Sequence, residues 1–496
     1  MSYSKYLVIA VMLLLFFNCK QPALLPGQKG QTYPILISEI DNREIPEGTS
    51  MRVHFAAIDD HLEMLKFHAE NLPAFVKIVQ EYNGKGFFQI DPPFGSKGTY
   101  NIRLFAENNG QLGVREFLIK VQSAPRNILY LSPKSHDFEA SGTREDPLPS
   151  LEAISKVKFP LGKEMNLYLQ DGYHGHPHFS ASSCNIYAAA GAKPVLSGIS
   201  FEAVSQVAIS GITISPEGKA SFYKDFSVVI DSLSNGVNIS NCEIKTAENT
   251  TNWTQDEWDE RANGGIITYG DNCIIENNFL KNIFHAVQTD ADNIIVKYNI
   301  IDRFAGDAIR NTGDNNIYSH NLIKNAVVDD YSDPDGNHDD CFQSWTFGKP
   351  ISNIIIKDNI AISCLEPNLR LKARVVQGIA CFDGFEENWI IEGNLVLIDH
   401  PHGIALFGAK KCIITKNTVL RNPYHFFDFE SNPWIMINDH KDGRPSSGNI
   451  VKNNLCDALE IKTEQGINQG NIIIDSNYDD YFQNYEGWDF RRGENK

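Results

Sequence analysis

The feature that most constrains the fold is a short motif that recurs along most of the chain. In each copy β-branched residues precede an asparagine, as in "CIIENNFL", "IIVKYNII" and "CIITKNTV". The asparagines are Asn241, Asn278, Asn299, Asn321, Asn359, Asn394, Asn417, Asn454 and Asn477, spaced by 37, 21, 22, 38, 35, 23, 37 and 23 residues. A step of 21–23 residues recurs, and four steps carry an insertion. A fixed step of this length is typical of solenoids.

We expect each step to be one turn of a right-handed parallel β-helix with three short strands and three bends. Asparagine stacked at the same bend tolerates left-handed dihedrals and can hydrogen-bond along the stack. The leucine-rich repeat has a similar period, but it requires Leu at fixed offsets and a helical segment, whereas these turns favour Ile, Val and Asn. The sequence therefore predicts an all-β chain with a β-helix over 126–485.

A small β-sandwich is predicted before the β-helix, over 34–124. Runs such as "SMRVHFAAID", "GFFQIDP" and "TYNIRLFAEN" alternate apolar and polar residues and are separated by turn signals such as "PEGT" and "FGSKGT". The pattern resembles the immunoglobulin-like or cadherin-like modules that precede catalytic domains in exported bacterial proteins. That resemblance implies a spacer or glycan-binding role. Residues 128–157 resemble the opening segment of bacterial β-helix proteins, in which a short amphipathic helix caps the coil.

The first residues resemble a bacterial lipoprotein signal. "MSYSK" is followed by the apolar run "YLVIAVMLLLFF" and then by "NCK", which places Cys19 where such signals are lipidated. A plain secretory signal with an incidental cysteine is the alternative. We expect a signal peptide over 1–19, a linker over 20–33, and an exported protein at the outer membrane or cell surface that contacts the membrane only through its lipid. The other cysteines form no CxxC pair, so we expect buried structural thiols.

The balance of charge limits the partners. Lys+Arg 44 against Asp+Glu 62 gives a formal net charge of −18, which argues against a nucleic-acid partner, because that would need a basic surface. An acidic glycan remains compatible, since a local basic cleft or bound cations can bridge two anions. We expect a monomer that acts on a polysaccharide.

Candidate functional residues emerge when the strand before each asparagine strand is aligned. "HAVQTDADN", "DAIRNTGDN", "DCFQSWTFG", "QGIACFDGF" and "HGIALFGAK" occupy equivalent places. The first column reads His285, Asp307, Asp340, Gln377 and His402, and the fourth reads Gln288, Arg310, Gln343, Ala380 and Ala405. Because neighbouring strands lie about 4.8 Å apart, we expect these columns to form one polar face.

Glycoside hydrolysis is the chemistry that these columns favour first. Asp307, Asp339 and Asp340 can supply an acid and a nucleophile or base, because crowding raises the pKa of one carboxyl and leaves the other ionised. A retaining pair would be Asp307 and Asp340, whereas Asp307 with Asp339, or Asp330 with Asp340, could be wider and suit inversion. His338 or His402 could move a proton. Residues expected to bind the sugar are His285, Gln288, Arg310, Gln343, Trp345, Arg374 and Gln377.

A calcium-dependent lyase is the second hypothesis. The loop "DDYSDPDGNHDD", 329–340, is rich in carboxylates, and Ca²⁺ prefers six to eight oxygen ligands. Asp330 and Asp339 are the candidate metal ligands. The whole of 126–480 resembles the pectate-lyase-like superfamily, whose lyases use calcium to acidify the uronate and a Lys or Arg to remove the C5 proton. That resemblance would assign the base to Arg310, Lys372 or Arg374.

The resemblance stops short of one enzyme family. The polygalacturonase pattern is matched by Asp339-Asp340 and His402-Gly403, but "LRLKAR" precedes His402 instead of following it. A non-catalytic glycan-binding protein is the third hypothesis, because β-helices also serve as rigid stalks. Clustered His and Asp argue against a stalk, which has no need of them.

Overall fold

The computed structural model describes residues 35–162, 164–216, 225–327, 339–346, 348–369, 371–372, 376–424, 432–474 and 477–492. The predicted signal peptide with Cys19, the linker, and the candidate residues Asp330, His338 and Arg374 lie outside these ranges. Within them no helix is long and apolar enough to cross a membrane.

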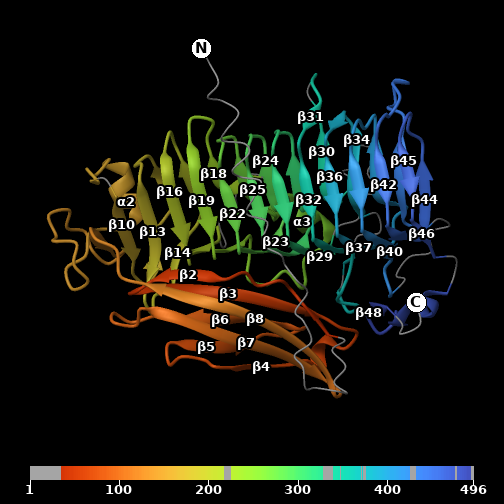
Figure 1. The fold of residues 1–496 in the computed structure, drawn as a ribbon. Helices are drawn as coiled ribbons and strands as arrows, with labels where there is room; N and C mark the ends of the chain where they lie inside the picture. Colours follow the sequence, from red (N-terminus) through yellow and green to blue (C-terminus); the bar gives the residue numbers. More distant parts are fainter. Residues whose placement is uncertain are drawn as a thin grey trace, which may run out of the picture.

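Three long parallel sheets form the body of the molecule, and the predicted all-β fold class with a parallel β-helix is confirmed (Figure 1). Each turn of the chain adds one strand to each sheet, as β22 (Ile274–Glu276), β23 (Phe279–Ile283) and β24 (Val287–Thr289) do. Sheet 1 runs from β9 (Ile128–Leu131) to β45 (Ile467–Gln469), and sheet 2 from β11 (Gly172–Tyr173) to β46 (Ile472–Ile473).

Sheet 3 carries the columns of polar residues. Its strands, in order, are β12 (His178–Phe179), β15 (Ile199–Phe201), β18 (Phe226–Ile230), β21 (Gly264–Thr268), β24, β27 (Ile309–Asn311), β30 (Asp340–Trp345), β34 (Gln377–Asp383), β38 (His402–Phe407), β41 (Trp434–Asn438) and β44 (Ala458–Ile461).

The interior of the coil is a stack of apolar side chains. Sheet 1 alone contributes Ile275, Val296, Tyr318, Ile356 and Ile391 from successive strands, each at most 2% exposed. Because every turn repeats the same inward pattern, each turn covers the core of the next. The eight described cysteines are buried free thiols, as expected. At the N-terminal end α2 (Leu151–Lys156) buries Leu151 and Ile154 in the same core, as a capping helix would.

A ladder of buried asparagines runs along one bend, between sheets 1 and 2. The side-chain Nδ2 of each donates to Oδ1 of the asparagine one turn on, at 2.8–3.0 Å. The ladder consists of Asn278, Asn299, Asn321, Asn359, Asn394, Asn417, Asn454 and Asn471. These bonds satisfy amides that would otherwise be costly to bury.

Both ends of the ladder differ from the sequence alignment. Cys242, not Asn241, occupies the first position, because its backbone N–H donates to Oδ1 of Asn278. Asn471, not Asn477, occupies the last. The left-handed conformation also belongs to the residue before each ladder asparagine, as at Asn277 (φ 60°) and Asn453 (φ 56°). The preceding residue makes the bend, and the asparagine then points into the stack.

The N-terminal residues form two sheets that pack face to face. One contains β2 (Arg43–Pro46), β8 (Gln111–Gln122), β7 (Gly98–Asn108) and β4 (Lys66–Glu70); the other contains β1 (Leu36–Ile37), β3 (Thr49–Ile58), β6 (Lys85–Ile90) and β5 (Val76–Gln80). This sandwich lies lengthwise below the coil in Figure 1. Outward residues of sheet 2, such as Ile300, Leu322 and Leu397, share one apolar cluster with Val53 and Phe88 of the sandwich. The sandwich is therefore part of one packed unit.

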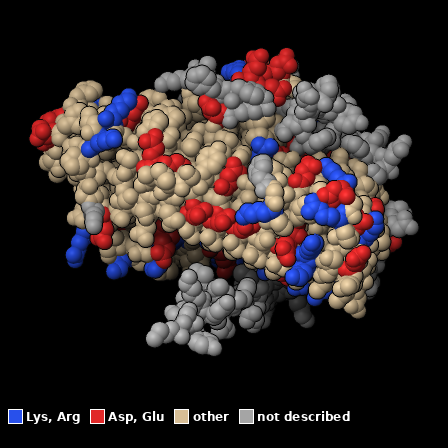
Figure 2. All heavy atoms as spheres, turned by 90° about the horizontal axis from the view of Figure 1, so that it is seen from above, with Lys and Arg blue, Asp and Glu red and all other residues tan. Residues whose placement is uncertain are grey.

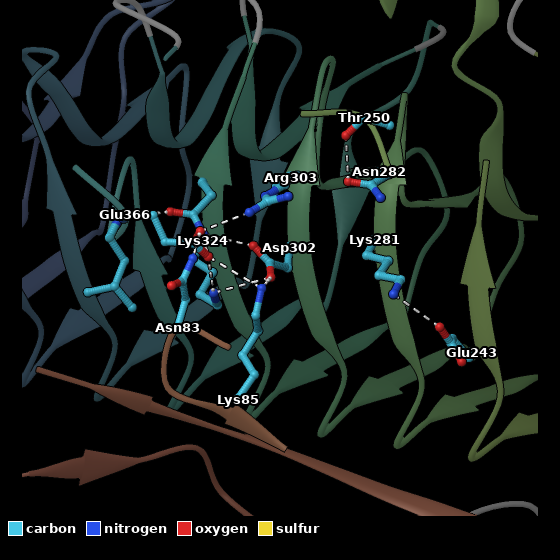
Figure 3. Close-up of polar contacts among 12 residues, drawn as sticks. Asn83, Lys85, Glu243, Thr250, Lys281, Asn282, Asp302, Arg303, Lys324 and Glu366 are labelled. Atoms are coloured by element: carbon cyan, nitrogen blue, oxygen red, sulfur yellow. Dashed lines mark hydrogen bonds and ion pairs between the residues drawn. The ribbon is translucent and has the colours of Figure 1, made fainter. Parts of the chain in front are cut away.

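A buried ionic cluster joins the sandwich to the coil (Figure 3). Nζ of Lys85 reaches from β6 to Asp302 (2.8 Å) and Glu366 (3.3 Å), and Nζ of Lys324 lies 3.2 Å and 3.5 Å from the same two carboxylates. Arg303 adds a third cation, 2.8 Å from Glu366. Three cations thus share two anions in a site where burial lowers the pKa of Lys324.

Candidate functional site

A cleft of about 640 Å³ opens on sheet 3. It begins at the first residues of β30, β34 and β38 and runs toward the last residues of β30 and β34. The residues that line it are Arg310, Asp340, Gln343, Ser344, Trp345, Thr346, Gln377, Ala380, Phe382, Asp383, His400, His402 and Lys441.

The register of sheet 3 agrees with the alignment of the sequence. Gln288 pairs with Arg310 and Arg310 with Gln343 on successive strands, and Gln343 then pairs with Ala380. Asp340 pairs with Gln377 in the first column. Six of the candidate residues consequently line one cleft, namely Asp340, His402, Arg310, Gln343, Trp345 and Gln377.

Asp307 lies behind this cleft. Its carboxylate has no exposed surface; Oδ2 lies 2.7 Å from Nε of Arg310, and Oδ1 accepts the backbone N–H of Asp340 at 3.0 Å. Burial raises the pKa of Asp307 to about 6, with Arg310 opposing the shift. Asp307 is thus held ionised at neutral pH beside Arg310 and positions both Arg310 and the start of β30, so it does not face a substrate as the hydrolase hypothesis expected.

Asp340 is the carboxyl that reaches the cleft. Burial and then the negative charge of Asp307 raise its pKa well above the usual range, against the effects of Arg310 and Gln343. Two neighbouring carboxyls that share one cation favour a state with one proton between them. The protonated form is therefore favoured at Asp340, which lies beside the Asp307–Arg310 ion pair.

His402 is oriented by Gln377. Nδ1 of His402 lies 2.8 Å from Oε1 of Gln377, and a carboxamide oxygen only accepts hydrogen bonds. Nδ1 therefore carries the ring proton, and in the neutral ring Nε2 carries the lone pair. The cleft thus holds an imidazole on β38 and a carboxyl of raised pKa on β30, with Gln377 on the strand between them.

The cleft also has aromatic and cationic walls. The guanidinium carbon of Arg310 lies 4.9 Å from the centre of the Trp345 ring, and the Phe382 ring lies 4.6 Å from that of His402. Lys441 reaches over from the segment after β41 and lies 2.5 Å from Oδ1 of Asp383. Exposed aromatic faces and cations suit an acidic sugar chain.

Several predicted residues lie elsewhere. His285 is 6% exposed and sits behind Arg310, whose Nη1 lies 3.1 Å from its Nε2. Gln288 lies one turn beyond Arg310 and bonds to Asp290. Asp339 is 3% exposed, just before β30, and is not among the lining residues.

The predicted calcium site cannot be assembled from the described residues. Of its candidate ligands, Asp339 is described and buried, whereas Asp330 is outside the described ranges. In the described part of the chain the group of three with metal-ligand spacing is Asp59, Asp60 and His61, in the sandwich.

Sequence reasoning missed His400, Phe382 and Asp383. His400 lies in the turn before β38, so no column of aligned strands contains it, although "HPH" is visible in the sequence. Phe382 and Asp383 follow a register shift between β30 and β34 that the alignment could not show.

Comparisons with known proteins give partial similarities. No family model and no curated protein matches the chain. Among solved structures, the A-module of a mannuronan C-5 epimerase from Azotobacter vinelandii aligns with 66% of this chain and 92% of that chain, with 11% identity and a TM-score of 0.31. An endo-fucoidan hydrolase of glycoside hydrolase family 107 aligns with 21% of this chain and 22% of its own, with 18% identity and a TM-score of 0.16. The titin M3 domain aligns with 18% of this chain and 99% of that domain, with 17% identity and a TM-score of 0.15. We therefore base the functional assignment on the residues of the cleft.

Proposed function

We propose that the protein cleaves an acidic polysaccharide in the sheet 3 cleft by β-elimination. The observation that carries the proposal is the row of Asp340, Gln377 and His402 on three neighbouring strands, with Gln377 bonded to Nδ1 of His402. Two strand spacings separate the acid from the base, which is about 10 Å between backbones. A sugar ring fits between side chains that converge from that separation.

The chemistry follows from these groups. Nε2 of His402 removes the proton on C5, the carbon next to the uronate carboxylate. The C4–O bond breaks, its electron pair leaves with the oxygen, and a C4–C5 double bond forms; the departing oxygen takes a proton from solvent. Arg310 and the carboxyl of Asp340, whose raised pKa favours the protonated form, bind the uronate carboxylate, where negative charge develops.

Glycoside hydrolysis is the second candidate, and the raised pKa of Asp340 favours it, because a neutral carboxyl can protonate a leaving oxygen. Hydrolysis also needs a nucleophile or base facing that acid. Asp307 is buried against Arg310, and Asp383 lies six residues beyond Gln377, or about 20 Å along the strand. His402 would then have to activate the water. We favour elimination because it needs one base, which His402 supplies, and no second carboxylate facing Asp340.

A panel of uronate-containing, sulfated and neutral polysaccharides tests the assignment. New chain ends with the ultraviolet absorbance of an unsaturated uronate would support elimination. New reducing ends without that absorbance would replace it with hydrolysis. Binding without either product would leave a non-catalytic glycan-binding protein.

We further propose, from the sequence alone, that the protein is exported as a monomer and held at the outer membrane or cell surface by a lipid on Cys19. Metabolic labelling with a radioactive fatty acid tests this. The wild type should be labelled and Cys19→Ser should not; equal labelling would remove Cys19 as the attachment site.

A further inference from the structure

A second hollow continues the cleft beyond the last residues of β34. It has a volume of about 330 Å³, and we call it the Phe385 hollow. Thr346 and Asp383 line both the cleft and this hollow, so the two are continuous. The centre of the hollow therefore lies at the opposite end of the strands from Asp340 and His402.

Cations surround the Phe385 hollow. Lys349, Lys410 and Arg444 line it, and the guanidinium carbon of Arg444 lies 3.6 Å from the centre of the Phe385 ring. Nε and Nη2 of Arg444 bond to Asp442, which leaves its Nη1 group for another acceptor. Lys349 pairs with Asp314, whereas Lys410 is exposed and has no ion pair among the described residues.

The acidic residues of the hollow are largely neutralised. Glu386 is 2% exposed, and burial raises its pKa well above the usual range, which favours its uncharged form. Asp383 is paired with Lys441. Glu387 lies 3.8 Å from Lys411. Lys410 is therefore a lining cation without an ion pair among the described residues, whereas the lining carboxylates of Asp383 and Glu387 each have a cation partner.

The shape of the hollow depends on close packing. A Cβ atom on Gly408 would lie 2.8 Å from the Phe385 ring and 3.0 Å from Cβ of His440, and the φ of Gly408 is +77°. Phe385 and His440 can thus approach each other, with ring centres 4.2 Å apart, and hold Arg444 in place. The cation is presented on a rigid aromatic surface.

We propose that a sugar chain bound in the cleft runs parallel to β30 and β34 into the Phe385 hollow, where Arg444 and Lys410 bind an acidic group of a sugar distal to the cleaved bond. The inference rests on the proposed function and adds that the substrate is polyanionic and long. The distance from Gln377 to Asp383, about 20 Å along the strand, means that short oligomers reach only one end. The acidic group can be a carboxylate or a sulfate.

The test uses Lys410→Ala and Arg444→Ala, with Lys452→Ala as the matched control. Lys452 is an exposed lysine at the end of β42 (Ile450–Lys452) and lines neither cavity. Activity is measured on sized oligogalacturonates, oligomannuronates and chondroitin sulfate oligomers. We expect Lys410→Ala to raise KM for long oligomers about three- to fivefold, as for an exposed charge contact, and Arg444→Ala to raise it more. KM for the shortest cleaved oligomers, and kcat, should not change. The sulfated series separates the two kinds of anion.

Binding of the same oligomers to the Asp340→Asn protein, measured by calorimetry, gives a second readout that needs no turnover. Weaker binding of long oligomers in the Lys410→Ala background would support the inference even if the cleavage chemistry differs from the proposal. Equal KM and equal binding in Lys410→Ala, Arg444→Ala and Lys452→Ala, in a protein that does cleave these chains, would overturn the inference and leave the proposed function standing. No cleavage and no binding by the wild type would overturn both.

Discussion

Oδ1 of Asp307 accepts the backbone N–H of Asp340 at 3.0 Å, so the buried carboxylate fixes the start of the strand that carries the cleft carboxyl. The same carboxylate holds Arg310 through Oδ2. One buried carboxylate thus sets the position of a carboxyl and of a cation that line the cleft. Asp307 on one turn therefore has a positioning role, whereas Asp340 on the next turn lines the cleft.

Asp340→Asn should reduce turnover of the cleaved polysaccharide by about 10²- to 10³-fold, the range for loss of one donor that stabilises developing charge, with unchanged circular dichroism. The carboxamide keeps the size of the side chain but donates a weaker hydrogen bond to the substrate carboxylate than a protonated carboxyl does. Asp290→Asn is the matched control, because Asp290 lies on the same face and bonds to Gln288 away from the cleft. Full activity in Asp340→Asn would remove this residue from the mechanism.

Replacing Gln377 by Leu should lower kcat much more than it raises KM. The substitution removes the acceptor that fixes Nδ1–H of His402, so the ring can take the other tautomer. His402→Ala should be more severe, and adding Gln377→Leu to it should cost little more, because both act through one group. Additive losses in the double variant would show that Gln377 acts independently of His402.

Asn299→Ala should destabilise the protein by about 2–4 kcal/mol, because several buried partners lose their hydrogen bonds at once. Nδ2 of Asn299 donates to Asn321 and to the carbonyl of Ile275, and its Oδ1 accepts from Asn278. Asn353→Ala is the control: Asn353 bonds to Asn315 in a similar stack that is exposed to solvent. Urea unfolding measures the difference, and equal effects of the two substitutions would contradict the role given to burial.

Glu366→Gln should destabilise the protein by about 3–5 kcal/mol, since it leaves three buried cations with one carboxylate. Lys324→Met should cost clearly less, because it removes the surplus cation and leaves two cations with two anions. Thermal unfolding of both variants checks the order. A larger loss in Lys324→Met would mean that Lys324 bonds better than its lowered pKa implies.

Asp457 makes stability depend on pH. Burial raises its pKa to about 7, although the backbone N–H of Arg421 and the hydroxyl of Tyr478 both donate to Oδ2. The folded state therefore binds this proton more tightly than the unfolded state, and the stability gained from it is complete below about pH 4 and lost as the pH rises toward 7. Asp457→Asn should flatten that part of the curve of melting temperature against pH. An unchanged slope between pH 5 and 8 would contradict the shift.

The repeat in the sequence was sufficient to predict the coil, because a fixed step with β-branched residues admits few other folds. The alignment of the repeats also predicts the register of sheet 3, because it places Arg310 beside Gln343, and the two residues do pair on neighbouring strands. The residues at the edges of the regular pattern were less predictable. Asn477 has the right neighbours in sequence, but the last step of the ladder is shorter and ends at Asn471.

The position of a residue in the alignment does not predict which way its side chain points. Asp307 and Asp340 have the same place in the alignment, yet Asp307 turns toward Arg310 and His285 whereas Asp340 reaches the cleft. The packing of the sandwich against the coil could not be predicted from the sequence either, because its contacts join residues such as Arg52 and Glu243, which are far apart in the chain.

The distribution of charged side chains over the face opposite the sandwich bears on how strongly it attracts an anionic chain. Seen from the side opposite the sandwich, the coloured Lys and Arg residues are interspersed with Asp and Glu toward the C-terminal end and do not form one basic block (Figure 2). For the acidic polysaccharide that we propose as substrate, we therefore expect little long-range attraction to this face and binding that depends on contacts inside the cleft.

The lengthwise sandwich changes how the coil can come apart. In a bare solenoid each turn contacts only its neighbours, so unfolding can start at an end and propagate turn by turn. Here the sandwich bonds to turns that are far from one another. Arg52 pairs with Glu243, and Lys85 pairs with Asp302 and Glu366. The backbone carbonyl of Asp60 accepts the hydroxyl of Tyr424. The turns between Glu243 and Tyr424 cannot open one by one without breaking these contacts, so we expect them to melt in a single cooperative transition despite the repetitive architecture.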